Sequence, residues 1–107
     1  MLHLTEHNFS AETTKSSLPV VVMFYAAWCG KCAMMKPRVE DIEERYRRRI
    51  LFCEVEIDES PALAEKYGAD FIPTFVLFKD GKLLEIFKGV MEEATFEKYL
   101  KKLFRIC

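Results

Sequence analysis

Alternating blocks of hydrophobic and polar residues divide the chain into predicted strands and helices. Residues 20–25 are an unbroken apolar run of β-formers, which is typical of a strand buried on both faces. Residues 51–57 alternate instead, with Cys53 on the apolar side and Phe52 and Glu54 on the other. This period of two predicts a second strand with one face toward the core.

After Cys29 the period of the apolar positions changes to that of a helix. The apolar stripe of this predicted helix is Met35, Val39, Ile42 and Tyr46. Pro37 lies inside it, and the missing N–H of proline predicts a kink. Ser60 and Pro61 predict the start of a shorter helix, with Ser60 as its N-cap, and Gly68 predicts its end.

The rest of the chain supplies a hairpin and two terminal helices. Asp80-Gly81 stands between the apolar runs 75–78 and 83–87, a strong signal for two antiparallel strands joined by a tight turn. Residues 5–15 predict a short helix, preceded by a short strand at Leu2–Leu4. A final helix carries the stripe Phe96, Leu100, Leu103 and Phe104.

Strands joined through helices are expected to be parallel, and the strands of the final hairpin antiparallel. The fold class is therefore α/β, with a central mixed β-sheet flanked by helices on both faces. The 107 residues, half of them apolar, predict a single domain, residues 1–107, that folds without metal or disulfide staples.

Charge and hydropathy exclude several function classes. The formal net charge is −1, which argues against binding to nucleic acid or to an anionic membrane, since both rely on a strong positive field. Residues 1–6 lack the basic and apolar regions of a signal peptide, and the longest apolar run, 20–28, is too short to span a bilayer. We therefore expect a cytoplasmic protein.

Cys29 and Cys32 are the candidate reactive groups, because cysteine pairs in a reducing compartment are more often catalytic or metal-binding than structural. They stand at the start of the long helix, where unpaired backbone N–H groups and Lys31 favour a thiolate at Cys29. Cys32 lies one turn along the same face. We predict that Cys29 attacks a target disulfide and that Cys32 then resolves the mixed disulfide.

A metal half-site is the alternative reading of the pair. A closed zinc site needs four ligands, and the remaining candidates, Cys53, Cys107, His3 and His7, are not suitably paired. We therefore predict no metal and no cofactor. Cys53 is expected to fill the core and Cys107 to be exposed, with both histidines at the surface.

Several segments, in order along essentially the whole chain, resemble the thioredoxin family. They are Trp28-Cys29-Gly30-Lys31-Cys32, Pro37, Ile72-Pro73-Thr74, Asp80-Gly81 and Gly89. The resemblance implies the thioredoxin fold, with a cis Pro73 facing the two cysteines. It also implies that Trp28, Ile72, Pro73 and Gly89 receive the target protein, and that Gly30 and Lys31 support the active site.

By analogy with the family, the chain would be a monomeric protein-disulfide reductase. Its partners would be disulfide-containing target proteins and a thioredoxin reductase, either a flavoprotein or ferredoxin-linked. Two alternatives stay open: an oxidase or isomerase, and a binding module that keeps the fold without the chemistry.

The sequence departs from the family pattern at the active site. Lys31 replaces the usual proline, so a more oxidising pair is expected. Met23 and Glu54 stand where the family usually has a buried aspartate and a neighbouring lysine. We hypothesise that Glu54 accepts the proton of Cys32 in place of that aspartate. The alternative is that Glu54 simply faces solvent and that the site runs without a dedicated base.

Overall fold

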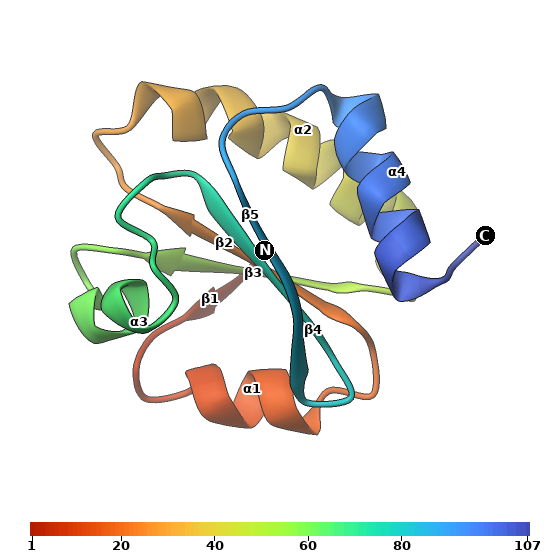
Figure 1. Ribbon diagram of the computed structural model, residues 1–107, viewed down its shortest axis with the longest axis horizontal. Coiled ribbons are helices and arrows are strands. Elements are labelled where there is room, and N and C mark those ends of the chain that lie inside the picture. Colours follow the sequence, from red (N-terminus) through yellow and green to blue (C-terminus); the bar gives the residue numbers. More distant parts are fainter.

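A five-stranded mixed sheet forms the centre of the computed structural model, which describes residues 1–107 (Figure 1). The elements are β1 (Leu2–Leu4), α1 (Phe9–Lys15), β2 (Val20–Tyr25), α2 (Gly30–Tyr46), β3 (Leu51–Glu56), α3 (Pro61–Lys66), β4 (Thr74–Lys79), β5 (Lys82–Lys88) and α4 (Glu93–Phe104). The strands lie in the order β1-β3-β2-β4-β5. The helix-linked strands β1, β3 and β2 are parallel, while β4 is antiparallel to β2 and β5 to β4. The predicted mixed sheet is confirmed.

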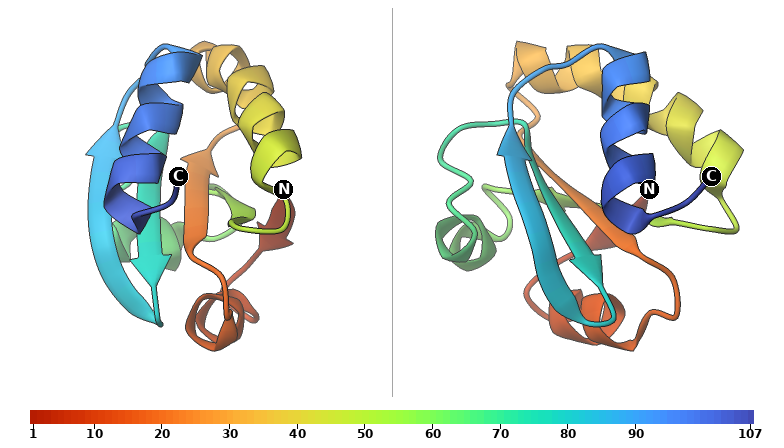
Figure 2. Two further views of the ribbon diagram at one scale, coloured as in Figure 1. Left: turned by 90° about the vertical axis from the view of Figure 1, so that its right-hand side faces the viewer. Right: turned by 45° about the vertical axis from the view of Figure 1, so that its right-hand side comes forward.

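Helices cover both faces of this sheet, with α2 and α4 on one face and α1 and α3 on the other (Figures 1 and 2). The guanidinium of Arg45 on α2 pairs with Glu93 at 3.2 Å and with Glu97 at 2.8 Å on α4. The hydroxyl of Tyr46 also donates to Glu97, at 2.6 Å. The first helix, α1, begins at Phe9, later than predicted. No helix combines the length and apolar character that crossing a membrane requires.

The core lies along the two central strands, β2 and β4. Residues 20–24 are all buried, so the predicted burial of this strand on both faces is confirmed. On β3, Cys53 is fully buried as predicted, but the placement of Phe52 on the polar side is wrong, because its ring is buried too. Because helices cover both faces of the sheet, part of the side of β3 that was predicted to be polar is buried as well.

The predicted hairpin turn and the predicted start and end of helix α3 are present. Asp80 and Gly81 have φ angles of 55° and 76°, and two successive residues in the left-handed region form the tight turn that matches strand twist in a hairpin. Helix α3 begins at Pro61 and ends before Gly68, whose φ is 67°. The predicted side-chain cap is absent, since the Ser60 hydroxyl oxygen is buried and makes no hydrogen bond.

Candidate active site

The two candidate cysteines meet at the N-terminus of α2. Cys29 is extended (φ −91°, ψ 110°) and precedes Gly30, the first helical residue. Its Sγ accepts a hydrogen bond from the backbone N–H of Cys32, with 3.1 Å between sulfur and nitrogen. Both cysteines are free thiols, and α2 continues beyond them as one helix through Pro37. A backbone donor of the helix terminus is thus directed at the Cys29 sulfur, where it stabilises negative charge.

The thiols differ in accessibility. Cys29 is 9% exposed and Cys32 only 3%, so a partner can reach Cys29 more easily, although neither lies open on the surface. Burial, with a smaller contribution from the contact with Cys29, raises the pKa of the Cys32 thiol to about 12. At neutral pH Cys32 is therefore protonated, and it has to lose its proton before it can act as a nucleophile.

The segment around Pro73 faces the thiols, as the family resemblance implied. The Ile72–Pro73 peptide bond is cis, and the carbonyl oxygen of Ile72 lies 4.0 Å from the Cys29 Sγ. The N–H of Gly89 donates to the carbonyl of Pro73 at 2.8 Å. Three of the four residues named for target docking are therefore gathered on one side of Cys29.

The fourth residue named for docking, Trp28, and a further aromatic residue, Phe71, are both exposed. The side chain of Trp28 is 70% exposed, and its indole Nε1 donates to Asp58 at 2.8 Å. Phe71 is 50% exposed, and the ammonium of Lys31 lies 5.4 Å from the centre of its ring. Asp58 and Phe71 were not among the residues predicted for the site. The one available signal for Phe71 was a large aromatic residue directly before Ile72, whereas Asp58 carried none.

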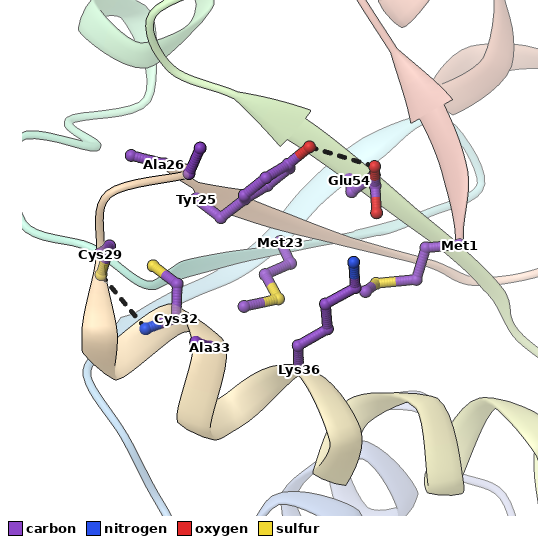
Figure 3. A pocket seen from close by; sticks show the side chains of 10 residues that line it. Met1, Met23, Tyr25, Ala26, Cys29, Cys32, Ala33, Lys36 and Glu54 are labelled. Carbon is purple, nitrogen blue, oxygen red and sulfur yellow. Dashed lines mark hydrogen bonds between the residues drawn. The ribbon is translucent and has the colours of Figure 1, made fainter.

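On the other side of the pair, a cavity of about 200 Å³ opens beside Cys32 (Figure 3). It is lined by Met1, Met23, Tyr25, Ala26, Ala27, Cys29, Cys32, Ala33, Lys36 and Glu54. The lining is mostly apolar, and apart from the cysteines its polar side chains are a phenol, an ammonium and a carboxylate. Met23 and Glu54 are direct partners in the pairing of β2 with β3.

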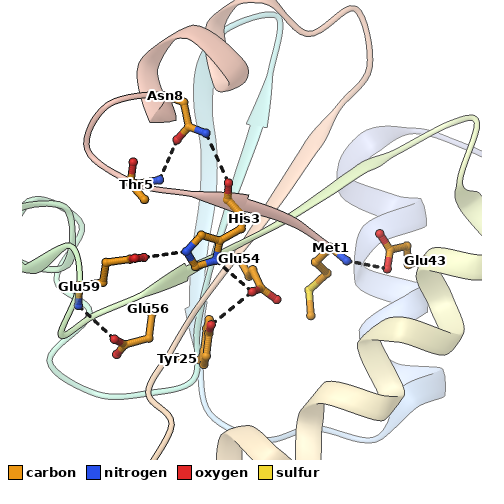
Figure 4. A network of polar contacts seen from close by, with 9 residues as sticks. All are labelled: Met1, His3, Thr5, Asn8, Tyr25, Glu43, Glu54, Glu56 and Glu59. Carbon is orange, nitrogen blue, oxygen red and sulfur yellow. Dashed lines mark hydrogen bonds and ion pairs between the residues drawn. The ribbon is translucent and has the colours of Figure 1, made fainter.

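Glu54 is held in a polar network at the rim of this cavity (Figure 4). It accepts hydrogen bonds from the hydroxyl of Tyr25 at 3.2 Å and from Nδ1 of His3 at 3.1 Å. The other ring nitrogen of His3 lies 2.6 Å from Glu59. With its side chain 17% exposed, Glu54 does not simply face solvent, so that part of the alternative is wrong. It also makes no hydrogen bond to Cys32.

The network shifts the titration of its members. Hydrogen bonds to Glu54 and Glu59 raise the pKa of His3 above its ordinary value, which favours a protonated ring that donates to both carboxylates. Burial and the neighbouring charge of Glu54 raise the pKa of Tyr25 to about 12. Tyr25 is therefore a neutral donor at physiological pH.

Comparison with known proteins decides the family. The family model described as Thioredoxin matches residues 1–102. The chain belongs to the thioredoxin family. It is 37% identical over 99 residues to thioredoxin 1 of Synechococcus elongatus and 36% identical over 99 residues to thioredoxin of Porphyra purpurea, with 92% of each chain covered in both cases. Thioredoxin of Acidithiobacillus ferridurans is 37% identical over 100 residues, covering 94% of this chain and 93% of its own.

The fold of a solved structure agrees with this assignment. A chain from work on the thiol-resolving mechanism of yeast mitochondrial 1-Cys peroxiredoxin via glutathione and thioredoxin systems superimposes with a TM-score of 0.85. The two chains are 32% identical, and the match covers 95% of this chain and 94% of the other. The thioredoxin-family assignment and the Cys29/Cys32 pair make this protein a thiol–disulfide oxidoreductase. Members of this family exchange electrons with a reductase and with disulfide-containing targets.

The remaining cysteines lie apart from the dithiol. Cys53 is fully buried in β3, and burial raises the pKa of its thiol to about 12, so the predicted core role is confirmed. Cys107 is exposed at the chain end, as predicted. No cluster of three or more His, Cys, Asp or Glu residues is arranged to hold a metal ion.

Proposed function

We propose that this chain is a cytosolic protein-disulfide reductase, in which residues 1–107 act as one monomeric thioredoxin-like domain. Cys29 is the nucleophile and Cys32 the resolving thiol. The observation that carries the proposal is the hydrogen bond from the Cys32 N–H to the Cys29 Sγ at the helix terminus. It supports a thiolate at Cys29 while the more deeply buried Cys32 keeps its proton.

The reaction has two exchange steps. The Cys29 thiolate attacks one sulfur of the target disulfide, forming a mixed disulfide and releasing the other target sulfur as a thiolate. Cys32 then loses its proton and attacks the Cys29 sulfur, which forms the Cys29–Cys32 disulfide and releases the second target thiolate. The target gains two electrons, and the chain loses two.

Target docking is proposed on the side of Cys29 that carries Trp28, Ile72, Pro73 and Gly89. An extended target segment would pair with the backbone beside Pro73, as the family resemblance implies. Phe71 enlarges the apolar surface next to that backbone, so we include it in the docking surface. The surface at Gly30 is open, since a Cβ atom there would meet no atom within 4 Å, and this leaves room for a target beside Cys29.

Glu54 is proposed as the proton acceptor for Cys32. It is the one carboxylate that lines the cavity beside Cys32, and the cavity can hold water between the two groups. The test compares the pH profile of the resolving step in the wild type and in Glu54→Gln. A shifted profile supports the role, and an unchanged profile rejects it.

The reductase activity is tested by insulin reduction with dithiothreitol as electron source. The wild type is expected to accelerate insulin precipitation, and Cys32→Ser is expected to lose catalysis. Cys107→Ser is the matched control, because the same substitution at an exposed cysteine remote from the dithiol should leave the rate unchanged. Activity that survives Cys32→Ser would contradict the dithiol mechanism.

The electron donor is proposed to be a thioredoxin reductase, either a nicotinamide-dependent flavoprotein or a ferredoxin-linked enzyme. Supplying the oxidised chain with each class of reductase and following the appearance of free thiols distinguishes the two. Trapping with Cys32→Ser should hold target proteins as mixed disulfides with Cys29. A chain that is reduced by neither class would contradict this part of the proposal.

A further inference from the structure

The resolving step requires charge to develop in an apolar place. Cys32 is buried, and its side of the dithiol faces the cavity beside Met23 (Figure 3). A thiolate at Cys32 loses the solvation that water would give it, and an apolar lining offers nothing in return. Met23 supplies neither a charge nor a proton acceptor at the base of the cavity. Any stabilisation must therefore come from the few polar groups of the lining.

Lys36 is placed to give that stabilisation. It lies four residues after Cys32 on α2, so the two side chains share one face of the helix, with Cβ atoms about 6 Å apart. Both Lys36 and Cys32 line the cavity, so the charge of the ammonium acts on Cys32 across it. Figure 3 shows Lys36 extending from α2 toward Met23 and Met1 on the sheet side of the cavity.

The other charges around the cavity are already paired. The carboxylate of Glu54 is held by Tyr25 and His3. The N-terminal ammonium of Met1 pairs with Glu43 at 3.3 Å. The ammonium of Lys36 forms no ion pair, so it is the cation of the cavity that is free to respond to a new negative charge.

We propose that Lys36 is a positioning residue for the resolving step, in which its ammonium stabilises the Cys32 thiolate across the cavity. This inference rests on the proposed two-step exchange. Lys36 keeps its own proton throughout and forms no bond. The proton of Cys32 leaves through the cavity to solvent or to Glu54, and the Cys32 electron pair forms the bond to the Cys29 sulfur.

The elevated pKa of the Cys32 thiol shows how much such help is needed, because very little of it is ionised at neutral pH. A nearby cation increases the thiolate fraction. Since Lys36 is exposed, its field is screened, and we expect its loss to slow the resolving step by roughly three- to tenfold.

The experiment follows the two exchange steps separately in the intact chain. Reduced protein carrying Cys107→Ser in every variant, so that the exposed chain-end thiol releases no colour, is mixed with dithiobisnitrobenzoate, an aromatic disulfide whose released thiolate is coloured. Attack by Cys29 releases the first coloured thiolate, and attack by Cys32 on the mixed disulfide releases the second. Stopped-flow absorbance between pH 5 and 10 gives a rate for each phase.

Lys36→Met keeps a chain of similar size and removes the charge. We expect it to slow the second phase by roughly three- to tenfold near pH 7, with its pH midpoint moved upward, and to leave the first phase unchanged. Lys36→Arg, which keeps the charge, should restore most of the rate. Lys98→Met is the matched control, because Lys98 is an exposed lysine on α4 that does not line the cavity.

Each outcome either supports or overturns the proposed role of Lys36. An unchanged second phase in Lys36→Met overturns the inference, and so does equal slowing of both phases, which would place the effect on Cys29. Equal slowing in Lys98→Met also overturns it, since net charge alone would then be the cause. A dithiol that releases only one coloured thiolate in the Cys107→Ser protein without further substitutions would instead contradict the proposed function itself.

Discussion

The two sides of the dithiol differ in how they are built. The docking side consists of Trp28, Phe71, Ile72, Pro73 and Gly89, and it presents exposed aromatic rings and backbone around Cys29. The cavity side consists of the residues beside Cys32, in which the ionisable groups are Tyr25, Lys36 and Glu54.

The docking side follows the thioredoxin-family pattern closely, whereas the cavity side departs from it at Met23 and Glu54. In the proposed function, recognition of the target and handling of the Cys32 proton therefore depend on separate sets of residues. A family member can keep its docking surface while its proton acceptor and nearby charges are rearranged. Substitutions on one side should leave the properties of the other side intact.

The largest effect is expected from the cysteines themselves. Cys29→Ser should lower the rate of reaction with a disulfide on the order of a thousandfold or more, because the nucleophile is lost. Cys32→Ser should also stop turnover, but it should still react once and accumulate a mixed disulfide. Mass spectrometry after incubation with an oxidised peptide distinguishes the two variants. A mixed disulfide located at Cys32 of Cys29→Ser would reverse the assigned roles, whereas one at the exposed Cys107 would not bear on them.

Placing an aspartate at position 23, where the family usually has one, should lower the stability of this chain. Met23→Asp buries a carboxyl group at a position that is 1% exposed, and we expect it to lower the free energy of unfolding by about 2–4 kcal/mol. Because burial raises the pKa of the new carboxyl, the loss should be small at acid pH and grow as pH rises above about 4.

Urea denaturation of the reduced protein at pH 4 and pH 8 measures this loss. Met34→Asp is the control, since Met34 is an exposed methionine on α2. Equal destabilisation by the two substitutions would contradict the burial argument.

A smaller effect is expected from Lys31, whose ammonium lies over the ring of Phe71 on the docking side. Lys31→Pro removes a cation that favours the Cys29 thiolate, and hence the reduced form, so the pair should become more reducing. We expect a change of roughly three- to tenfold in the equilibrium constant, or about 15–30 mV. Redox titration against glutathione measures it, and a change toward a more oxidising value would contradict the electrostatic role of Lys31.

The smallest effect concerns His3, at the rim of the cavity side. Its raised pKa means that the protonated ring stabilises the fold. That stabilisation should be complete below pH 6.5 and should disappear as pH rises through the folded-state pKa. Because His3 is 45% exposed, His3→Gln should cost only about 0.5 kcal/mol at pH 6 and less at pH 9. Thermal melts test this, with His7→Gln as the control.

The fold was largely predictable because local sequence and tertiary packing agree. The apolar run 20–25 requires burial on both faces, and the central place of β2 in the sheet provides it. Asp80-Gly81 favours a tight turn before any long-range contact exists. Phe52 was placed wrongly because alternation along β3 cannot show how much of each face a helix will cover.

The candidate site was predictable only where its residues are close in sequence. The helix-terminal position of Cys29 and Cys32 follows from the strand-to-helix change in period. The partners of Trp28 and Glu54 do not, since Asp58 and His3 are brought to them by the fold across 30 and 51 residues of chain. No local pattern carries that information.

Trp28 is the one tryptophan of the chain, and it stands next to Cys29. Every photon of indole emission therefore originates beside the reactive sulfur, and its intensity depends on the bond to Asp58 and on whatever covers the exposed ring. The chain thus carries its own optical reporter. Oxidation, mixed-disulfide formation and target docking can all be followed in real time without attaching a dye.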